Sequence, residues 1–78
     1  MIVTEKPVVI SYLKKRGLVL KYLKAKNNIL KGNFRAVDLK KRMPHSDDIW
    51  YFRIDKKYRA LAEKVDNKLF VFLISDHQ

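Results

Sequence analysis

The spacing of apolar residues changes along the chain and predicts helices first and strands afterwards. Met1–Thr4 is a short, partly β-branched apolar stretch that predicts a strand, and the threonine at its end is the expected N-cap of a helix. Apolar residues then recur at helical spacing in two stretches, 8–13 and 18–30, with Gly17 between them. We therefore expect two helices, the second closed by Lys31–Gly32 in the manner of a glycine C-cap.

Beyond this glycine the apolar period falls to two, which is typical of strands. The stretches that fit are Phe34–Leu39, Ile49–Ile54, Tyr58–Val65 and Leu69–Ser75. Asp66–Asn67 is a strong signal for a two-residue hairpin turn, and the strand after it is apolar on both faces, which predicts a place inside the sheet. The element order predicts one α+β domain over residues 1–78. Its N-terminal strand and two helices pack on one face of a mostly antiparallel four- to five-stranded sheet.

Composition narrows the class of partner. The chain has 18 Lys and Arg against 8 Asp and Glu, a net charge of +10, and such an excess attracts polyanions. It has no cysteine, which fits a reducing compartment. We see no signal peptide, and the longest apolar run, Leu69–Ile74, is far shorter than the ~20 residues of a membrane span. These features predict a soluble, cytoplasmic protein that contacts nucleic acid, the ribosome or an acidic protein.

The face of the sheet that the helices leave open has the chemistry of a phosphate site. If residues 55–57 form a turn, Arg53 lies opposite Arg59, with Tyr51 on the same side, and the guanidinium fork suits phosphate. The other side of these strands is a sensible core face, made of Trp50, Phe52, Tyr58, Ala60 and Ala62. Nearby lysines and an arginine are candidate RNA-binding residues: Lys40, Lys41, Arg42, Lys56 and Lys57.

The polar residues after the last strand are candidates for proton transfer. Histidine is the natural proton donor or acceptor near neutral pH, and His77 follows that strand. Strict alternation from the hairpin turn instead places Asp76 on the face of Arg59. Either the chain leaves the sheet before His77, or Asp76 is the functional group. The other histidine, His45, lies in a polar loop and is expected to be exposed.

The sequence contains no glycine-rich phosphate loop, no HExxH and no carboxylate cluster with metal-ligand spacing. We therefore expect neither a metal nor a cofactor. The enzymatic option that remains is metal-independent phosphoryl chemistry on RNA, in which the RNA's own 2′-hydroxyl is the nucleophile. The protein then needs only to orient that hydroxyl, neutralise the developing charge and protonate the leaving oxygen.

The C-terminal half resembles the RelE/ParE toxin superfamily over roughly residues 34–77. The likeness rests on Trp50-Tyr-Phe-Arg-Ile-Asp-Lys-Lys-Tyr-Arg59, the hairpin at Asp66–Asn67, and Leu69-Phe-Val-Phe-Leu-Ile-Ser-Asp-His77. The N-terminal strand and helices agree with the family in order only. The resemblance implies a type II toxin, with a ribosome-dependent mRNA endoribonuclease of the RelE/YoeB kind favoured. It also implies a cognate acidic antitoxin as partner, with the ribosome and mRNA as targets.

The same resemblance implies roles for single residues. Arg59 corresponds to the arginine that stabilises the scissile phosphate, Arg53 to a basic residue on the preceding strand, and His77 to the general acid of YoeB-like members. The chain departs from those members in two places: Asp38 is the only carboxylate near the expected position of the base, and Gln78 stands where they end in tyrosine. Two alternatives stay open, a ParE-like inhibitor of DNA gyrase without catalytic activity and a non-catalytic RNA-binding module.

Overall fold

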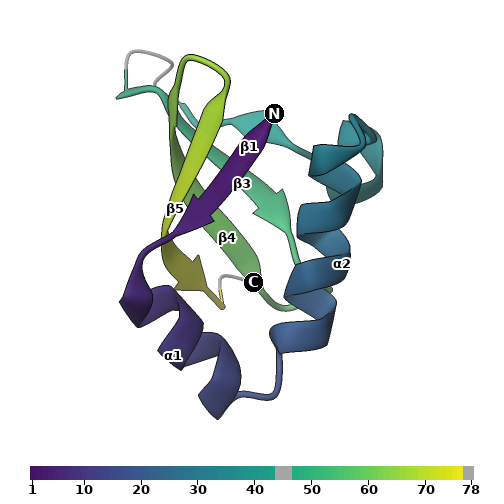
Figure 1. Cartoon of the computed structure of the whole chain (residues 1–78), viewed down its shortest axis with the longest axis vertical. Coiled ribbons are helices and arrows are strands. Elements are labelled where there is room, and N and C mark those ends of the chain that lie inside the picture. Colours follow the sequence, from purple (N-terminus) through teal and green to yellow (C-terminus); the bar gives the residue numbers. More distant parts are fainter. Residues whose placement is uncertain (44–46, 77–78) are drawn as a thin grey trace.

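The computed structural model describes residues 1–43 and 47–76, which form an α+β fold with a five-stranded sheet (Figure 1). The strands lie in the order β1-β5-β4-β3-β2, with β1 parallel to β5 and the other neighbours antiparallel, so the sheet is mixed and open. In chain order the elements are β1 (Ile2–Glu5), α1 (Pro7–Lys15), α2 (Val19–Leu30), the 3-10 helix η1 (Phe34–Val37), β2 (Lys40–Lys41), β3 (Ile49–Arg53), β4 (Arg59–Val65) and β5 (Lys68–Ser75). The predicted fold class is confirmed.

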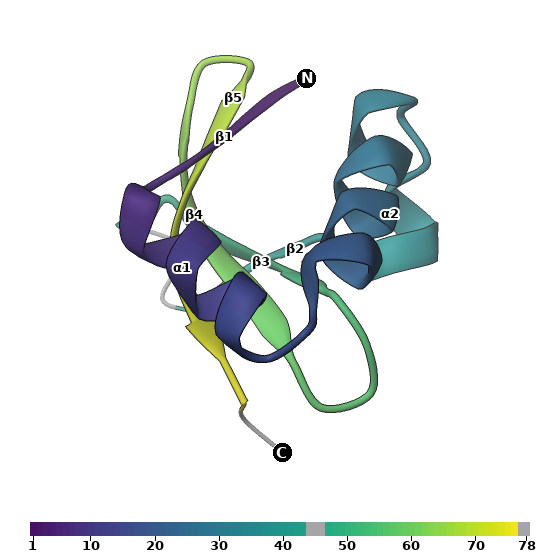
Figure 2. The same cartoon turned by 60° about the horizontal axis from the view of Figure 1, so that its bottom comes forward.

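Both α-helices lie on the same side of the sheet and cover its core face (Figure 2). The core joins Val9 and Leu13 of α1 and the inner side of α2 to the side chains that the sheet directs toward them. The predicted core face of β3 and β4 is confirmed: Phe52, Ala60 and Ala62 are fully buried, and Trp50 and Tyr58 pack against them. Within the described residues, no helix combines the length and apolar character that crossing a bilayer would need.

Two glycines set the helix boundaries as the sequence indicated. Gly17 adopts a left-handed φ of +64° between the two helices, so they are separate, and Gly32 follows α2 with a φ of +82°. The predicted N-cap is wrong. Thr4 pairs with Phe70 in the parallel β1–β5 ladder, so the strand continues to Glu5 and the first helix begins after Lys6.

The strand predicted over Phe34–Leu39 is also wrong. Residues 34–37 form the 3-10 helix η1, and Asp38 ends it in a left-handed conformation with a φ of +51°. This short 3-10 turn packs against α2 and buries Val37. If the chain after Gly32 were extended, Val37 would lie beyond the end of the helix and would not be buried against it. Within residues 34–41, the two that pair with β3 are Lys40 and Lys41.

β5 lies inside the sheet between β1 and β4, as its apolar character predicted, but it contains a β-bulge. Leu61 is opposite Leu73 while Ala62 is opposite Val71, so Phe72 is an extra residue on β5. An extra residue shifts the alternation of side chains by one position. The bulge therefore keeps three apolar residues of β5 on the core side, which strict alternation would not allow: Leu69, Val71 and Ile74.

A polar network ties α2 to β1 at the edge of the core. The Tyr22 hydroxyl donates to Glu5 Oε2 at 2.7 Å, and Lys26 Nζ donates to the same oxygen at 2.8 Å. The Tyr22 ring is buried and lies 6.2 Å from the ring of Phe52 between centroids. Burial, then the hydrogen bond to Glu5 and its negative charge, raise the pKa of the Tyr22 phenol well above its usual range.

The connection between β3 and β4 is held by Asp55. Its Oδ1 accepts the backbone N–H groups of Lys57 and Tyr58 at 2.8 Å each, and Lys21 Nζ donates to Oδ2 at 3.3 Å. Desolvation acts to raise the pKa of this carboxyl, but the two backbone hydrogen bonds and the Lys21 ammonium together lower it below its usual value. The turn therefore fixes the residue at which β4 begins. It thereby also fixes the position of Arg59, the first residue of that strand.

Candidate nucleic-acid interface

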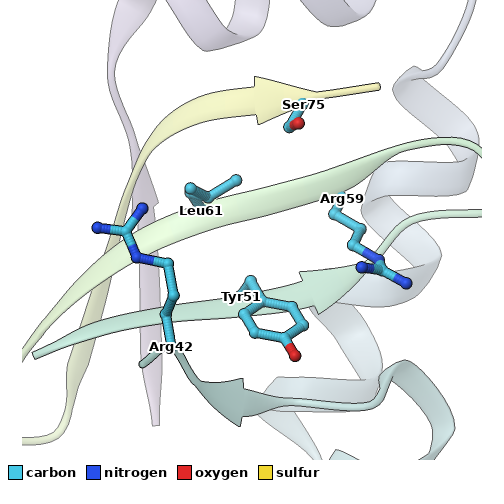
Figure 3. A pocket seen from close by; sticks show the side chains of 5 residues that line it. All are labelled: Arg42, Tyr51, Arg59, Leu61 and Ser75. Atoms are coloured by element: carbon cyan, nitrogen blue, oxygen red, sulfur yellow. The ribbon is translucent and has the colours of Figure 1, made fainter. Parts of the chain in front are cut away.

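The face of the sheet away from the helices carries a depression of about 380 Å³ (Figure 3). Its walls come from four neighbouring segments of the sheet, and its lining residues are Arg42, Tyr51, Arg59, Leu61 and Ser75. In Figure 3 the Tyr51 ring lies between the two arginine side chains, while Leu61 and Ser75 lie on the strands beyond it. Two cations, an aromatic ring and a hydroxyl therefore share one hollow.

Arg59 is the first residue of β4 and is paired with Arg53 on one side and Ser75 on the other. The predicted placement of the two arginines opposite each other is confirmed. Like charges directly opposite each other on a sheet are destabilising, so this pair costs folding energy unless an anion lies between or beside them. One such anion is the carboxylate of Asp38, which lies beside Arg53.

The two arginines differ in how they are neutralised. The Arg53 guanidinium forms an ion pair with Asp38 at 2.8 Å, and both side chains are about half exposed. Asp38, the carboxylate considered for a base, is thus engaged by Arg53 and does not line the depression. Arg59 has no ion pair with any carboxylate of the described residues, and its guanidinium carbon lies 5.7 Å from the centroid of the Tyr51 ring. Its charge is available to a ligand.

The three basic residues 40–42 do not all lie on the same face of the sheet. Lys40 is opposite Tyr51 and lies on the open face, whereas Lys41 is opposite Trp50 and so belongs to the core side. Lys41 Nζ pairs with Asp48 at 3.2 Å. Arg42 returns to the open face, lines the depression and pairs with Asp47 at 3.5 Å with both side chains well exposed.

The turn lysines lie at the end of the sheet where β4 begins. Lys56 and Lys57 are both exposed, and Lys57 Nζ lies 5.4 Å from the centroid of the Tyr58 ring, which belongs to the core side. Neither lysine lines the depression. These lysines would therefore contact RNA only where the RNA chain extends beyond the hollow. Their RNA-binding role stays a prediction.

The β5 bulge changes the assignment of the residues after that strand. Alternation had placed Asp76 on the face of Arg59, and this is wrong, because the extra residue Phe72 puts Ser75 opposite Arg59. Asp76 is exposed and does not line the depression. His77 and His45 lie outside the described residues. With the register corrected, alternation no longer favours Asp76 over His77.

Sequence reasoning missed Leu61 and Ser75 as lining residues. Leu61 was visible as the residue opposite Tyr51 once the β3–β4 turn had been placed, since that register follows from the turn. Ser75 was hidden by the bulge, which leaves no signal in a run of apolar residues. In residues 1–43 and 47–76 no group of three or more Asp, Glu or His lies close enough to hold a metal ion.

Comparison with known proteins adds no family to this geometry. No protein-family model matches the chain, and no curated protein sequence matches it.

Proposed function

We propose that this protein is a cytoplasmic type II toxin of the RelE/ParE kind that cleaves mRNA on the ribosome. The observation that carries the proposal is the Arg59 guanidinium. It lies in a hollow beside an aromatic ring and has no ion-pair partner among the described residues. A guanidinium fork binds phosphate, and an aromatic ring stacks on an unpaired base, so the two together suit single-stranded RNA.

The proposed reaction needs no metal and no cofactor. The 2′-hydroxyl of the RNA gives its proton to water while its oxygen attacks the adjacent phosphorus. The bond from phosphorus to the 5′-oxygen breaks, and a 2′,3′-cyclic phosphate remains. Arg59 neutralises the charge that develops on the phosphate oxygens. Arg53, opposite Arg59 on the neighbouring strand, adds positive charge if the phosphate displaces Asp38 from it. His77 is the proposed acid that protonates the 5′-oxygen.

The open face also supports an inhibitory partner. Leu73 of β5 is opposite Leu61 of the hollow, and Phe70 follows on the same face; the two are 49% and 41% exposed, and an exposed apolar patch marks a protein-interaction site. The net charge of +10 favours an acidic partner. We therefore propose that a cognate acidic antitoxin covers this face and blocks Arg59.

The test compares catalysis with general basicity in a purified translation system. Arg59→Ala should lower the single-turnover rate of mRNA cleavage about 100- to 1000-fold, because it removes a donor aimed at the developing charge, with ribosome affinity much less affected. Arg59→Lys should rescue poorly, since a point charge cannot reproduce the bidentate fork. Lys14→Ala is the matched control, because it removes one exposed positive charge from α1, on the helical side of the sheet. It should change the rate less than threefold.

The other outcomes assign the protein elsewhere. Cleavage by Arg59→Ala within a few-fold of wild type would show that Arg59 is not at the reacting phosphate. Intact mRNA with inhibited supercoiling by purified gyrase would assign the protein to the ParE branch. RNA binding without cleavage and without growth arrest would make it a binding module. Lys56→Ala should weaken ribosome binding modestly, and more so at low salt, if the turn lysines contact RNA.

A further inference from the structure

Helix α2 has two apolar faces, and the core uses only one of them. Tyr22, Ala25 and Ile29 are buried against the sheet and η1. On the opposite side of the helix, Leu20, Leu23 and Leu30 are 81%, 49% and 48% exposed. A helix that packs on one side only has polar residues on its outer face, so these leucines are not explained by the fold of this chain.

The outer residues follow the spacing of a coiled-coil seam. Leu20, Leu23, Asn27 and Leu30 are separated by three, four and three positions, which is the a-d-a-d pattern of a heptad. A shallow depression runs along this seam and is lined by Leu23, Lys24, Lys26, Asn27 and Leu30. Asn27 occupies an a position, where a polar residue fixes the register of the partner helix.

The charges beside the seam identify the kind of partner. The e and g positions that flank the leucines hold Lys24, Lys31 and Lys26. Lys26 is engaged by Glu5, but no described carboxylate pairs with Lys24 or Lys31. A second copy of this helix would set these lysines against one another in either orientation, because parallel coils join g to e and antiparallel coils join e to e and g to g. Self-association is therefore disfavoured.

We propose that the outer face of α2 docks an acidic amphipathic helix of a partner protein, with aliphatic residues at the seam and Glu or Asp beside it. The buried residues of α2 face the sheet, so the exposed leucines face away from it. The Arg59 depression lies on the other face of the sheet, so a helix docked on α2 leaves it open. The inference does not rest on the proposed ribonuclease activity. An acidic antitoxin that contacts both faces would satisfy both proposals, but either surface can function without the other.

The probe is a labelled 21-residue helical peptide with Leu and one Asn at its seam and Glu at e and g. Its controls are a peptide with Lys in place of Glu and a scrambled peptide of the same composition. The full chain should bind the Glu peptide with a Kd in the micromolar range at 0.15 M salt, at least tenfold more tightly than either control, measured by fluorescence anisotropy. The scrambled peptide matters most, because a basic protein attracts any acidic chain.

Two variants locate the site. Leu23→Ser should weaken binding of the Glu peptide at least tenfold, whereas Val8→Ser removes an apolar side chain of α1 that is 63% exposed and should change nothing. Circular dichroism confirms that each variant is folded. Combined Lys24→Glu and Lys31→Glu should reverse the preference toward the Lys peptide.

Four results would overturn the proposal. Equal binding of the scrambled peptide, or full affinity in Leu23→Ser, would mean that the attraction is general electrostatics. A dimer in sedimentation that Leu23→Ser dissolves would mean that a second copy covers the seam. No saturable binding of the Glu peptide up to millimolar concentration would mean that the stripe is not a helix-docking surface.

Discussion

Replacing Tyr22 by Phe removes one hydroxyl from a buried ring and tests the network that joins α2 to β1. The ring itself should keep its place, because Phe has the same shape and the contact with Phe52 involves only carbon atoms. The change deletes the 2.7 Å hydrogen bond to Glu5 and leaves that carboxylate with Lys26 alone. No cavity larger than one oxygen atom is created.

The expected loss follows from the charge of the acceptor. A hydrogen bond to a charged group contributes about 1.5–3 kcal/mol, whereas one between neutral groups contributes about 1 kcal/mol. We expect Tyr22→Phe to lower the free energy of unfolding by about 2 kcal/mol. For a domain of this size that corresponds to a fall in Tm of roughly 8–16 °C. Glu5→Gln keeps an acceptor for Tyr22 but removes the charge that pairs with Lys26, so its loss measures the ion pair and not the tyrosine hydrogen bond.

Thermal and urea unfolding at pH 7, followed by circular dichroism, measure the effect. Tyr58→Phe is the matched control, because the Tyr58 ring packs edge-on against Tyr12 while its hydroxyl has no hydrogen bond within the described part of the chain. It should change the unfolding free energy by less than about 0.5 kcal/mol, because it removes no hydrogen bond among the described residues and keeps the packed ring. If Tyr22→Phe loses no more than this control, the network does not stabilise the fold and the reasoning fails.

Tyr22→Phe should also change how stability depends on pH in the alkaline range. The folded pKa of Tyr22 lies above its ordinary value of 10.0, so the neutral phenol contributes stability that is fully present below that value. This stability is lost as the pH rises beyond it, because the unfolded chain ionises first. Tyr22→Phe should therefore flatten the decline of the urea midpoint above about pH 10.

Three further predictions concern single positions. The pKa of Asp55 is lowered in the folded protein, so the ionised carboxylate stabilises the fold at pH values above its ordinary pKa of 3.8. This stabilisation is lost as the pH falls through the folded pKa. Asp55→Asn should therefore flatten the fall of the urea midpoint at acid pH. Gly32→Ala should cost about 1–2 kcal/mol in thermal unfolding from its left-handed φ alone, since a Cβ there meets no atom; an unchanged Tm would refute this. Deleting Phe72 should leave a folded sheet in which nuclear Overhauser contacts still place Arg59 opposite Ser75, and an unfolded product would contradict the assigned register.

The parts of the fold that the sequence predicted are those with local signals. The Asp66–Asn67 turn fixed the β4–β5 hairpin, and residues 55–57 fixed the register that sets Arg53 opposite Arg59. The stretch 34–39 misled, because its apolar residues suit a strand as well as a single turn that buries Val37 against a helix. Packing against α2 favours the turn over the strand. The order of residues within 34–39 carries no information about that packing.

The sequence predicted the positively charged residues of the site better than it predicted which face of the sheet each residue lies on. Arg59 and Tyr51 follow from strand alternation, and Arg42 from the basic run. That Lys41 lies on the other face follows only from its pairing with Trp50, which requires knowing where the two-residue strand β2 begins. Ser75 required the bulge, and an unbroken apolar run gives no sign of one extra residue.

The position of β5 joins two parts of the sheet that are far apart in the sequence. β1 is made first, yet its backbone partners are residues 68–71, so it stays unpaired until those residues have left the ribosome. Pairings between such distant segments form slowly, because the chain loses its loop entropy before the contacts are gained. The Arg59 depression includes Ser75 and does not exist before then. The complete hollow, in which the proposed function places the RNA, therefore forms only after residue 75 has left the ribosome.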